Sequence, residues 1–278
     1  MSGQLKEIKT RIKSVQSTQQ ITKAMKLVSA SKLRRAQDRI IKMRPYALKL
    51  NEILANIAEA AEGDVSIEYA VQRPAEKVLA VILTSDRGLC GGFNNNAGKL
   101  VTQMLEEKYS SQYAVGNVSV MYLGKKGYEI FKKNKKINHL EEHVNAFGDL
   151  SFDNISAIAE YVMDAFVKKE YDRVEVVYHR FKNQMIQIPA IEQFLPIQKL
   201  EAEGVEKDEK KVKADFEFEP NKEELIAELA PKILKTQFYR YLLENNASEH
   251  GARMTAMDNA TENAEELIKD LKIKFNRA

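Results

Sequence analysis

The chain has 278 residues, 30% of them charged, with a formal net charge of +3, a single cysteine and no tryptophan. One cysteine excludes an internal disulfide, and no apolar run approaches the roughly 20 residues that span a bilayer, so the sequence predicts neither a disulfide scaffold nor an integral membrane protein. The first residues also lack the apolar core of a signal peptide, so we expect a mature, soluble chain in a reducing compartment.

The first segment of the chain predicts one long helix over residues 1–62. Small and apolar residues recur there at alternating spacings of four and three, which indicates a coiled-coil seam. Gln19 and Lys26 interrupt the seam, and Pro45 predicts a kink or a local break. The seam positions are Ile8, Ile12, Val15, Thr22, Ser29, Leu33, Ala36, Ile40, Met43, Ala47, Leu50, Leu54, Ile57 and Ala61.

Residues 1–44 are strongly basic, with twelve Lys or Arg against two acidic residues. Such a segment can form a solvated helix face, a nucleic-acid site or a site for an acidic protein. It has no aromatic residue before Tyr46 and so offers no surface on which bases could stack, which disfavours nucleic acid. The solvated face and the acidic protein partner both stay open.

The middle of the chain, residues 76–197, predicts an α/β layer domain. Val78–Leu83 is a continuous apolar run, typical of a strand that is covered on both faces, and Val118–Leu123 is expected to be a second strand. Alternation of such strands with helices predicts a parallel sheet. Further strands are expected at residues 173–179 and 185–197, and helices from the Gly-rich turn to about Tyr109, from Gly124 through Phe131, and over residues 151–170.

The Gly-rich turn Asp86–Asn94 follows the first strand, which is where α/β proteins bind ligands. It matches neither the dinucleotide fingerprint nor a P-loop, which disfavours a nucleotide site. Cys90 lies beside Arg87 but has no histidine near it in sequence, so a tight structural turn is favoured over a nucleophile. His139 and His143 are four residues apart, which would place them on one face of a helix, and we interpret them as surface residues. The sequence therefore predicts no catalytic, cofactor-binding or metal-binding residue.

The last segments are predicted to be a charged loop at 198–220 and a second long helix at 221–278. Its seam resembles that of the first helix, although Gly251 lowers the local helix propensity by about 1 kcal/mol. Two such helices at opposite ends of one chain can bury their seams on each other, so an antiparallel coiled coil is the simplest arrangement. The seam positions are Leu229, Ile233, Thr236, Leu243, Ala247, His250, Met254, Met257, Thr261, Ala264, Ile268, Leu271 and Phe275.

Several motifs resemble, in the same order and over nearly the whole chain, the gamma-subunit family of F-type rotary ATP synthases. The resemblance implies a long antiparallel coiled coil of the two terminal helices plus a central Rossmann-like α/β domain that binds no dinucleotide. It also implies a central stalk or rotor, a non-catalytic subunit that couples proton flow through the membrane c-ring to ATP synthesis at the catalytic beta subunits. The motifs are residues 12–25, 29–33, 44–46, 85–94, 219–220 and 247–261.

The family also implies partners, a location and contact residues. The expected partners are the hexamer of alpha and beta subunits, the epsilon subunit and the c-ring, with one copy of this chain per complex, peripheral at the cytoplasmic face of a bacterial plasma membrane. By position in the family, the beta-subunit contacts are Met25, Lys26 and Arg253, and the foot that faces the c-ring is Phe216, Glu217, Phe218 and Glu219.

The C-terminal end and the cysteine content of this chain can also be compared with the family's pattern. Family members continue past Ala278, so the contacts of the far end of the C-terminal helix are not assigned. Cys90 is the only cysteine, so we do not expect thiol regulation of the plastid kind. Apart from the resemblance, two alternatives stay open: a nucleotide-dependent α/β enzyme with helical arms, and a coiled-coil scaffold or basic nucleic-acid binder.

Overall fold

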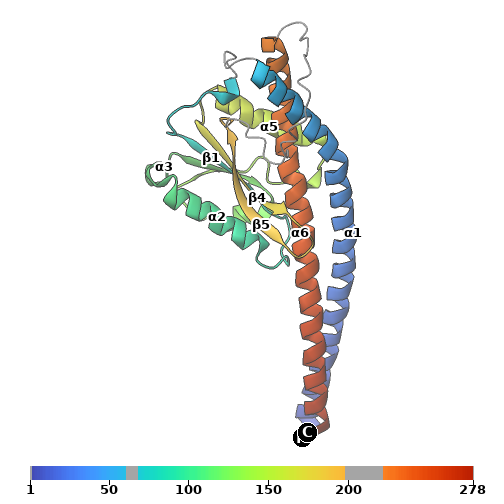
Figure 1. The fold of residues 1–278 in the computed structure, drawn as a ribbon. Coiled ribbons are helices and arrows are strands. Elements are labelled where there is room, and N and C mark those ends of the chain that lie inside the picture. The colour runs from blue at the N-terminus through green and yellow to red at the C-terminus, as the bar shows by residue number, and fades with distance from the viewer. Residues whose placement is uncertain (1, 61–67, 198–221, 278) are drawn as a thin grey trace.

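A computed structural model describes residues 2–60, 68–197 and 222–277 (Figure 1). The predicted loop at 198–220 lies outside the described residues. Two long helices, α1 (Ser2–Ala60) and α6 (Lys222–Arg277), lie side by side and carry an α/β layer along part of their length. Two short 3-10 helices, η1 (Glu68–Ala70) and η2 (Ala146–Gly148), complete the connections.

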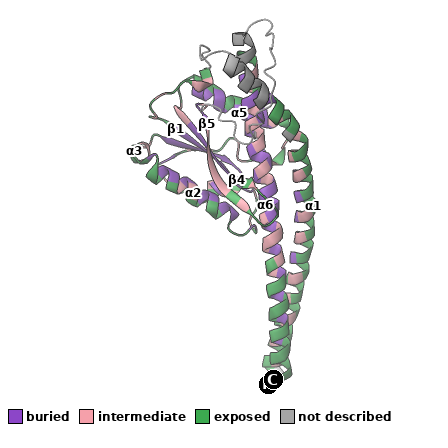
Figure 2. Cartoon of the chain, in the orientation of Figure 1, coloured by how far each residue is buried: buried purple, intermediate pink, exposed green. Residues whose placement is uncertain are grey.

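The two long helices form the antiparallel coiled coil that the sequence predicts. Rising numbers on α1 meet falling numbers on α6: Thr22 contacts Thr261, Ala36 packs on Ala247, and Leu50 packs on Ile233. Burial on the lower coiled coil follows a stripe between the helices while the outer faces are exposed (Figure 2). The seam positions Leu54, Ile57 and Ala61 lie outside the residues whose side chains are described.

Pro45 lies inside α1 without ending it. Figure 1 shows α1 changing direction towards its C-terminal end while the helix continues. Of the two outcomes that the sequence allowed at Pro45, the local break is therefore wrong. The proline ring removes one backbone donor, which a long helix tolerates when tertiary packing holds it on both sides.

The sheet has five strands in the order β3-β2-β1-β4-β5. The first four are mutually parallel, as predicted, and β5 is antiparallel to β4, so the prediction of a parallel sheet is wrong for this edge strand alone. Only five residues join β4 to β5, and a parallel pair needs a crossover of a dozen or more. The strands are β1 (Val78–Leu83), β2 (Val118–Leu123), β3 (Asn138–Leu140), β4 (Arg173–Phe181) and β5 (Gln187–Leu195).

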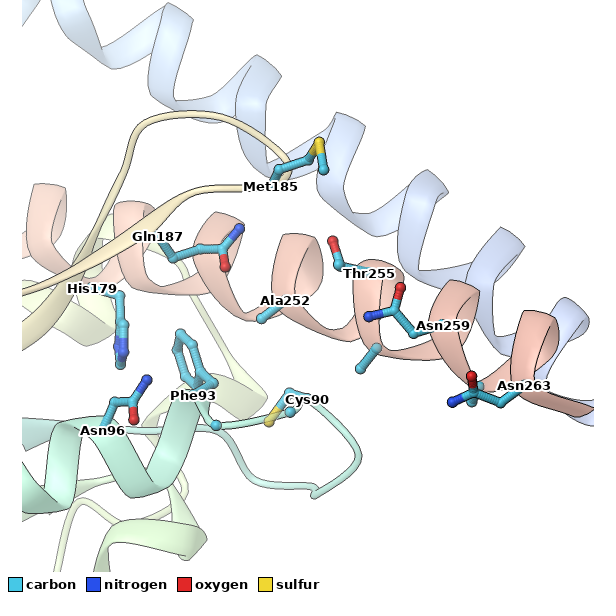
Figure 3. Close-up of a pocket in the computed structure, with 14 residues that line it drawn as sticks. Cys90, Phe93, Asn96, His179, Met185, Gln187, Ala252, Thr255, Asn259 and Asn263 are labelled. Carbon is cyan, nitrogen blue, oxygen red and sulfur yellow. The ribbon is translucent and has the colours of Figure 1, made fainter.

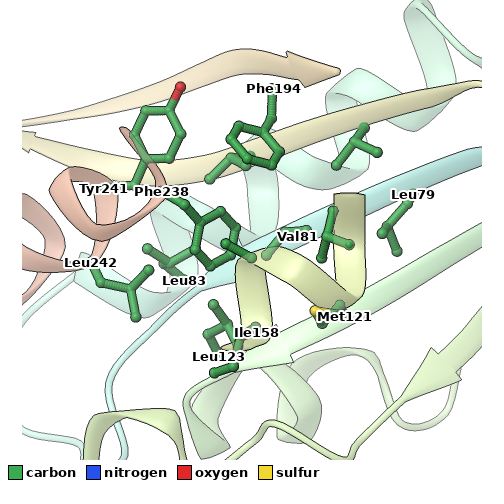
Figure 4. Close-up of a cluster of buried hydrophobic side chains, with 14 of the residues drawn as sticks. Leu79, Val81, Leu83, Met121, Leu123, Ile158, Phe194, Phe238, Tyr241 and Leu242 are labelled. Carbon is green, nitrogen blue, oxygen red and sulfur yellow. The ribbon is translucent and has the colours of Figure 1, made fainter. Parts of the chain in front are cut away.

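Helices cover both faces of this sheet. Apolar side chains of α2 (Phe93–Glu107) and α4 (Lys125–Phe131) pack on one face, and α3 (Ser110–Ala114) follows α2 along the chain. The other face packs on α5 (Phe152–Val167) and on α6, which contributes Phe238, Tyr241 and Leu242 to the core (Figure 4). The C-terminal helix therefore belongs to both the coiled coil and the α/β core.

Candidate functional site

The turn after β1 is held in one conformation by its own hydrogen bonds. The Ser85 amide donates to Asn94 Oδ1 over 2.9 Å, and Ser85 Oγ donates to the Arg87 carbonyl over 2.6 Å. Leu89 and Gly91, on either side of Cys90, have φ values of 62° and 60°. Cys90 itself is buried with 2% exposure, so the structure agrees with the prediction of a tight structural turn.

Gly124 supports the same turn from the neighbouring strand end. Its φ is 109°, and a Cβ at this position would collide with the Thr84 carbonyl oxygen. Thr84 Oγ1 donates to the Gly124 carbonyl and accepts from the Gly127 amide. The ends of β1 and β2 are thereby joined where an α/β protein would otherwise hold a ligand.

A groove of about 400 Å³ lies where the turn, the start of α2, the β4–β5 hairpin and α6 meet (Figure 3). Carboxamides and small side chains line most of it, together with Phe93, His179 and Met185, and no lining residue is a carboxylate, a lysine or an arginine. A nucleotide phosphate would therefore find no countercharge there. The carboxamides and small side chains include Asn96 on α2, Gln187 on β5, and Ala252, Thr255, Asn259 and Asn263 on α6. Elsewhere in the described residues, no group of three or more His, Cys, Asp or Glu is arranged to hold a metal ion.

Arg253, a predicted partner contact, points into this chain. Its side chain lies on α6 and is buried with 9% exposure for the residue. Nη1 pairs with Glu249 Oε1 over 2.6 Å, and Nη2 donates to the Arg87 carbonyl over 3.0 Å. Sequence reasoning missed Glu249, although a carboxylate four residues before an arginine on a helix is a readable signal.

Met25 and Lys26 on α1 are half-buried and lie close to the seam. Lys26 Nζ pairs with Asp258 Oδ1 on α6 over 2.5 Å, with side-chain exposures of 34% and 40%. A pair this exposed contributes about 0–1 kcal/mol to stability. The structure thus brings Lys26 to a partner within the chain, while Phe216, Glu217, Phe218 and Glu219 lie outside the described residues.

His139 and His143 do not share a helix, so the shared helix face that their spacing would allow does not form. His139 lies in β3, where its Nδ1 is 2.7 Å from Tyr122 Oη, and His143 lies in a turn against the ring of Tyr161. Both are half-buried rather than fully exposed. The three-residue strand β3 was too short to predict from its sequence, and it is what redirects His139 towards β2.

His179 and His250, which lie in this region, both have strongly lowered pKa values. Burial is the main cause that lowers the pKa of each imidazole from 6.5 to about 4, and for His250 the charges of Arg253 and Lys32 contribute to that shift. The ring of His179 stacks on Phe93 with centroids 4.0 Å apart, and His250 lies next to Glu249 on α6. Both side chains are therefore neutral at physiological pH.

We expect acidification to weaken the fold through these two histidines. Unfolded imidazoles take up a proton near pH 6.5 and folded ones only near pH 4, so their stabilisation is complete above 6.5 and declines as pH falls between those values. Between pH 7 and 5 the loss is about 2 kcal/mol per histidine. Burial raises the pKa of Glu244 and Glu249, which acts in the opposite direction.

The measurement therefore compares variants rather than reading one curve. Thermal unfolding of the parent and of the double variant His179→Gln, His250→Gln is followed at pH 7, 6 and 5. The variant is expected to lose less stability than the parent over this range. Parallel pH profiles for the two proteins would contradict the assignment.

Comparison with known proteins gives one consistent family. The family profile described as ATP synthase matches residues 4–278. The ATP synthase gamma chain of Cytophaga hutchinsonii is 54% identical over 274 residues, which cover 99% of this chain and 92% of that protein. The ATP synthase gamma chain of Flavobacterium psychrophilum is 47% identical with the same coverage.

Solved structures give the same fold at lower identity. A chain in the rotor of the Euglena gracilis mitochondrial ATP synthase aligns with a TM-score of 0.65 at 21% identity, covering 100% of this chain and 98% of that one. A chain in the central stalk and c-ring structure of the Tetrahymena thermophila enzyme aligns with a TM-score of 0.56 at 22% identity, covering 86% and 99%. The predicted combination of a long coiled coil and an α/β domain is confirmed.

Proposed function

The chain belongs to the ATP synthase gamma-chain family, and on that premise we propose that it is the rotor of a bacterial F-type enzyme, coupling proton flow through a membrane c-ring to ATP synthesis. The observation that carries the proposal is the full-length relationship at 54% identity, combined with a coiled coil that extends beyond the α/β layer (Figure 1). A subunit of ATP synthase belongs to a membrane-associated complex. In the described residues, no helix is both long and apolar enough to cross a bilayer.

The length of the coiled coil supports a shaft. Helices α1 and α6 have 59 and 56 residues, which at 1.5 Å per residue gives roughly 85–90 Å. Part of that length has no α/β layer beside it (Figure 1). A shaft of this kind can reach into a ring of subunits while its other end carries the α/β layer.

The middle of the seam supports a shaft that holds itself together with small groups. Thr22 and Thr261 are both buried, with hydroxyl oxygens 2.7 Å apart, and Ser29 is 3% exposed. The two helix axes can therefore approach closely here, and the shaft stays thin. On its outer side α1 exposes Ile21, Leu27 and Val28, apolar groups that suit contact with surrounding subunits.

The proposed partners are the alpha–beta hexamer around the shaft and the epsilon subunit and c-ring at the α/β end, with one copy of the chain per complex. In this arrangement the chain contributes no catalytic group and lies at the cytoplasmic face of the plasma membrane. Met25 and Lys26 meet the acidic lever loop of a beta subunit. The c-ring contact is made by Phe216, Glu217, Phe218 and Glu219, and Arg253 lies where a beta loop approaches α6.

Co-expression tests the proposal against the alternative functions. The full chain is expected to purify in a complex with alpha and beta subunits and to be required for coupled ATP synthesis by that complex. Equilibrium dialysis of the chain alone with ATP or NAD is expected to give no saturable binding in the micromolar range. Saturable nucleotide binding without hexamer association would favour the nucleotide-dependent enzyme instead.

The basic face of α1 gives a quantitative prediction. Neutralising Lys23, Lys32, Arg34 and Arg35 together is expected to weaken association with the hexamer several-fold, and more strongly at low than at high salt, because exposed charges are screened within about 8–10 Å. Lys26 is left unchanged because its ion pair with Asp258 joins the two helices. Single changes are expected to have little effect.

The matched control neutralises four exposed lysines of the α/β layer, Lys99, Lys132, Lys133 and Lys135. It removes the same charge from another surface. The affinity of each variant for the alpha–beta hexamer is measured by binding to the hexamer immobilised on a sensor surface, over a series of salt concentrations. Equal weakening by both quadruple variants would mean that net charge, rather than the basic face of α1, drives association.

A further inference from the structure

Arg253 is the place where the C-terminal helix holds the turn after β1. Three of its donor bonds reach the turn: Nη2 to the Arg87 carbonyl at 3.0 Å and to the Gly88 carbonyl at 3.3 Å, and Nε to Gly88 at 3.4 Å. Nη1 is held by Glu249, one helical turn earlier on α6. The guanidinium and its carboxylate are only 11% and 10% exposed. Because the guanidinium is planar and is bonded on both sides, it fixes the orientation of the turn relative to α6 as well as the distance between them.

Hydrogen bonds within the turn connect the carbonyls bound by Arg253 to β1, the central strand of the sheet. Ser85 bonds the Arg87 carbonyl and is itself bonded to Asn94 at the start of α2. A force on the Arg87 and Gly88 carbonyls is therefore carried by a closed set of hydrogen bonds into β1 and α2. Leu89, at the tip, is 65% exposed and takes no part in the hold.

A second set of hydrogen bonds joins α6 to the sheet, from residues that lie earlier on the same face of the helix. Asn245 Oδ1 accepts from the His179 amide over 3.1 Å, and Ser248 Oγ donates to the His179 carbonyl over 3.0 Å. Residues 245, 248, 249 and 253 share one helix face because they are spaced by three and four. Since β1 and β4 are neighbours, this polar face joins α6 to two adjacent strands. The coiled-coil seam occupies the remaining side, with Ala247 packed on Leu33 and Ala36.

We propose that Arg253 acts inside the chain as a latch that fixes the Ser85–Gly92 turn to α6. It adds a second attachment to the apolar joint made by Phe238, Tyr241 and Leu242, and so stops the turn end of the α/β layer from moving against the coiled coil under load. The proposal rests on the rotor function. It assigns Arg253 a positioning role, in which the arginine acts on coupling through the turn. A direct contact with a beta subunit is the competing explanation of any Arg253 phenotype.

A covalent bypass separates the two explanations. A Cβ built on Gly91 would lie 4.0 Å from the Cβ of Ala256, within the range of about 3.5–4.5 Å that a disulfide bridges. Gly91→Cys with Ala256→Cys, in a Cys90→Ser background, therefore offers a switchable link between the same turn and the same helix. The left-handed backbone at Gly91 lowers the yield of the link but permits it, as Leu89 has the same φ.

The test uses the assembled complex in vesicles. Arg253→Gln is expected to reduce several-fold the ratio of ATP-driven proton pumping to ATP hydrolysis, both measured on the same complexes. Arg253→Lys, which keeps the charge and loses the planar guanidinium, is expected to behave like Arg253→Gln. Oxidising the cysteine pair in the Arg253→Gln background is expected to restore most of the pumping, and reduction is expected to remove it again. Single-cysteine variants should not respond.

Hydrogen exchange of the full chain supplies a readout that does not depend on rotation. Amides of the 85–92 turn are expected to exchange at least tenfold faster in Arg253→Gln and to regain protection on oxidation. Unchanged exchange in Arg253→Gln would overturn the latch itself. Restored protection without restored pumping would assign Arg253 to a partner contact and also overturn it. Absence of coupling in the parent complex would instead remove the proposed function.

Discussion

Replacing Phe238 by alanine is expected to lower the free energy of unfolding by about 3–5 kcal/mol, the range for large-to-small changes in a packed core. Phe238 is fully buried where α6 meets the sheet, with its ring centroid 5.3 Å from that of Phe194 on β5 (Figure 4). The change opens a cavity at the joint between the coiled-coil helix and the α/β layer. Against a typical total stability of 5–15 kcal/mol, much of the margin would be lost.

The matched control is Phe275→Ala on the same helix, where the phenylalanine is 36% exposed. It deletes the same atoms from a site that the solvent already reaches, so we expect a loss below about 1 kcal/mol. Urea unfolding of the full chain, followed by circular dichroism, measures both. Similar losses for the two variants would mean that α6 is not part of the α/β core.

How much of the fold can be predicted depends on the kind of signal. Strands β1 and β2 have the predicted bounds because each is a short, mostly apolar segment that ends at a polar residue or a glycine. The sequence of β5 is compatible with either pairing, but the short link to β4 is too short for a parallel crossover, so link length rather than strand pattern predicts its direction. The three-residue strand β3 has no periodic signal at all.

The site is less readable than the fold. The Glu249–Arg253 pair follows from helical spacing, but the two carbonyls that complete it are 165 and 166 residues away in sequence. The Lys26–Asp258 pair depends on the register of the coiled coil, which a seam of small residues specifies weakly. Family position predicts a partner contact for Arg253, whereas its bonds to Glu249 and to the turn after β1 support the proposed role within the chain.

Linking this chain covalently to a beta subunit is expected to abolish coupled ATP synthesis while every catalytic residue stays intact. Met25 on the shaft, which we propose faces beta, is changed to cysteine, with a matching cysteine in the proposed beta lever loop. Cys90→Ser removes the native thiol, which is buried beside Asn94. Oxidation should stop synthesis and hydrolysis completely, and reduction should restore both, because only the disulfide has changed.

A second disulfide, inside the shaft, distinguishes rotation from chemical damage. Thr22 and Thr261 face each other across the seam with oxygens 2.7 Å apart, so Thr22→Cys with Thr261→Cys should staple α1 to α6. A rotor turns as a unit, and joining its own helices should leave synthesis near the parent rate under the same oxidant. If the link to beta and the internal staple both stop synthesis, oxidation or internal stiffening is responsible. If neither stops it, the shaft does not turn against beta and the chain is a static scaffold.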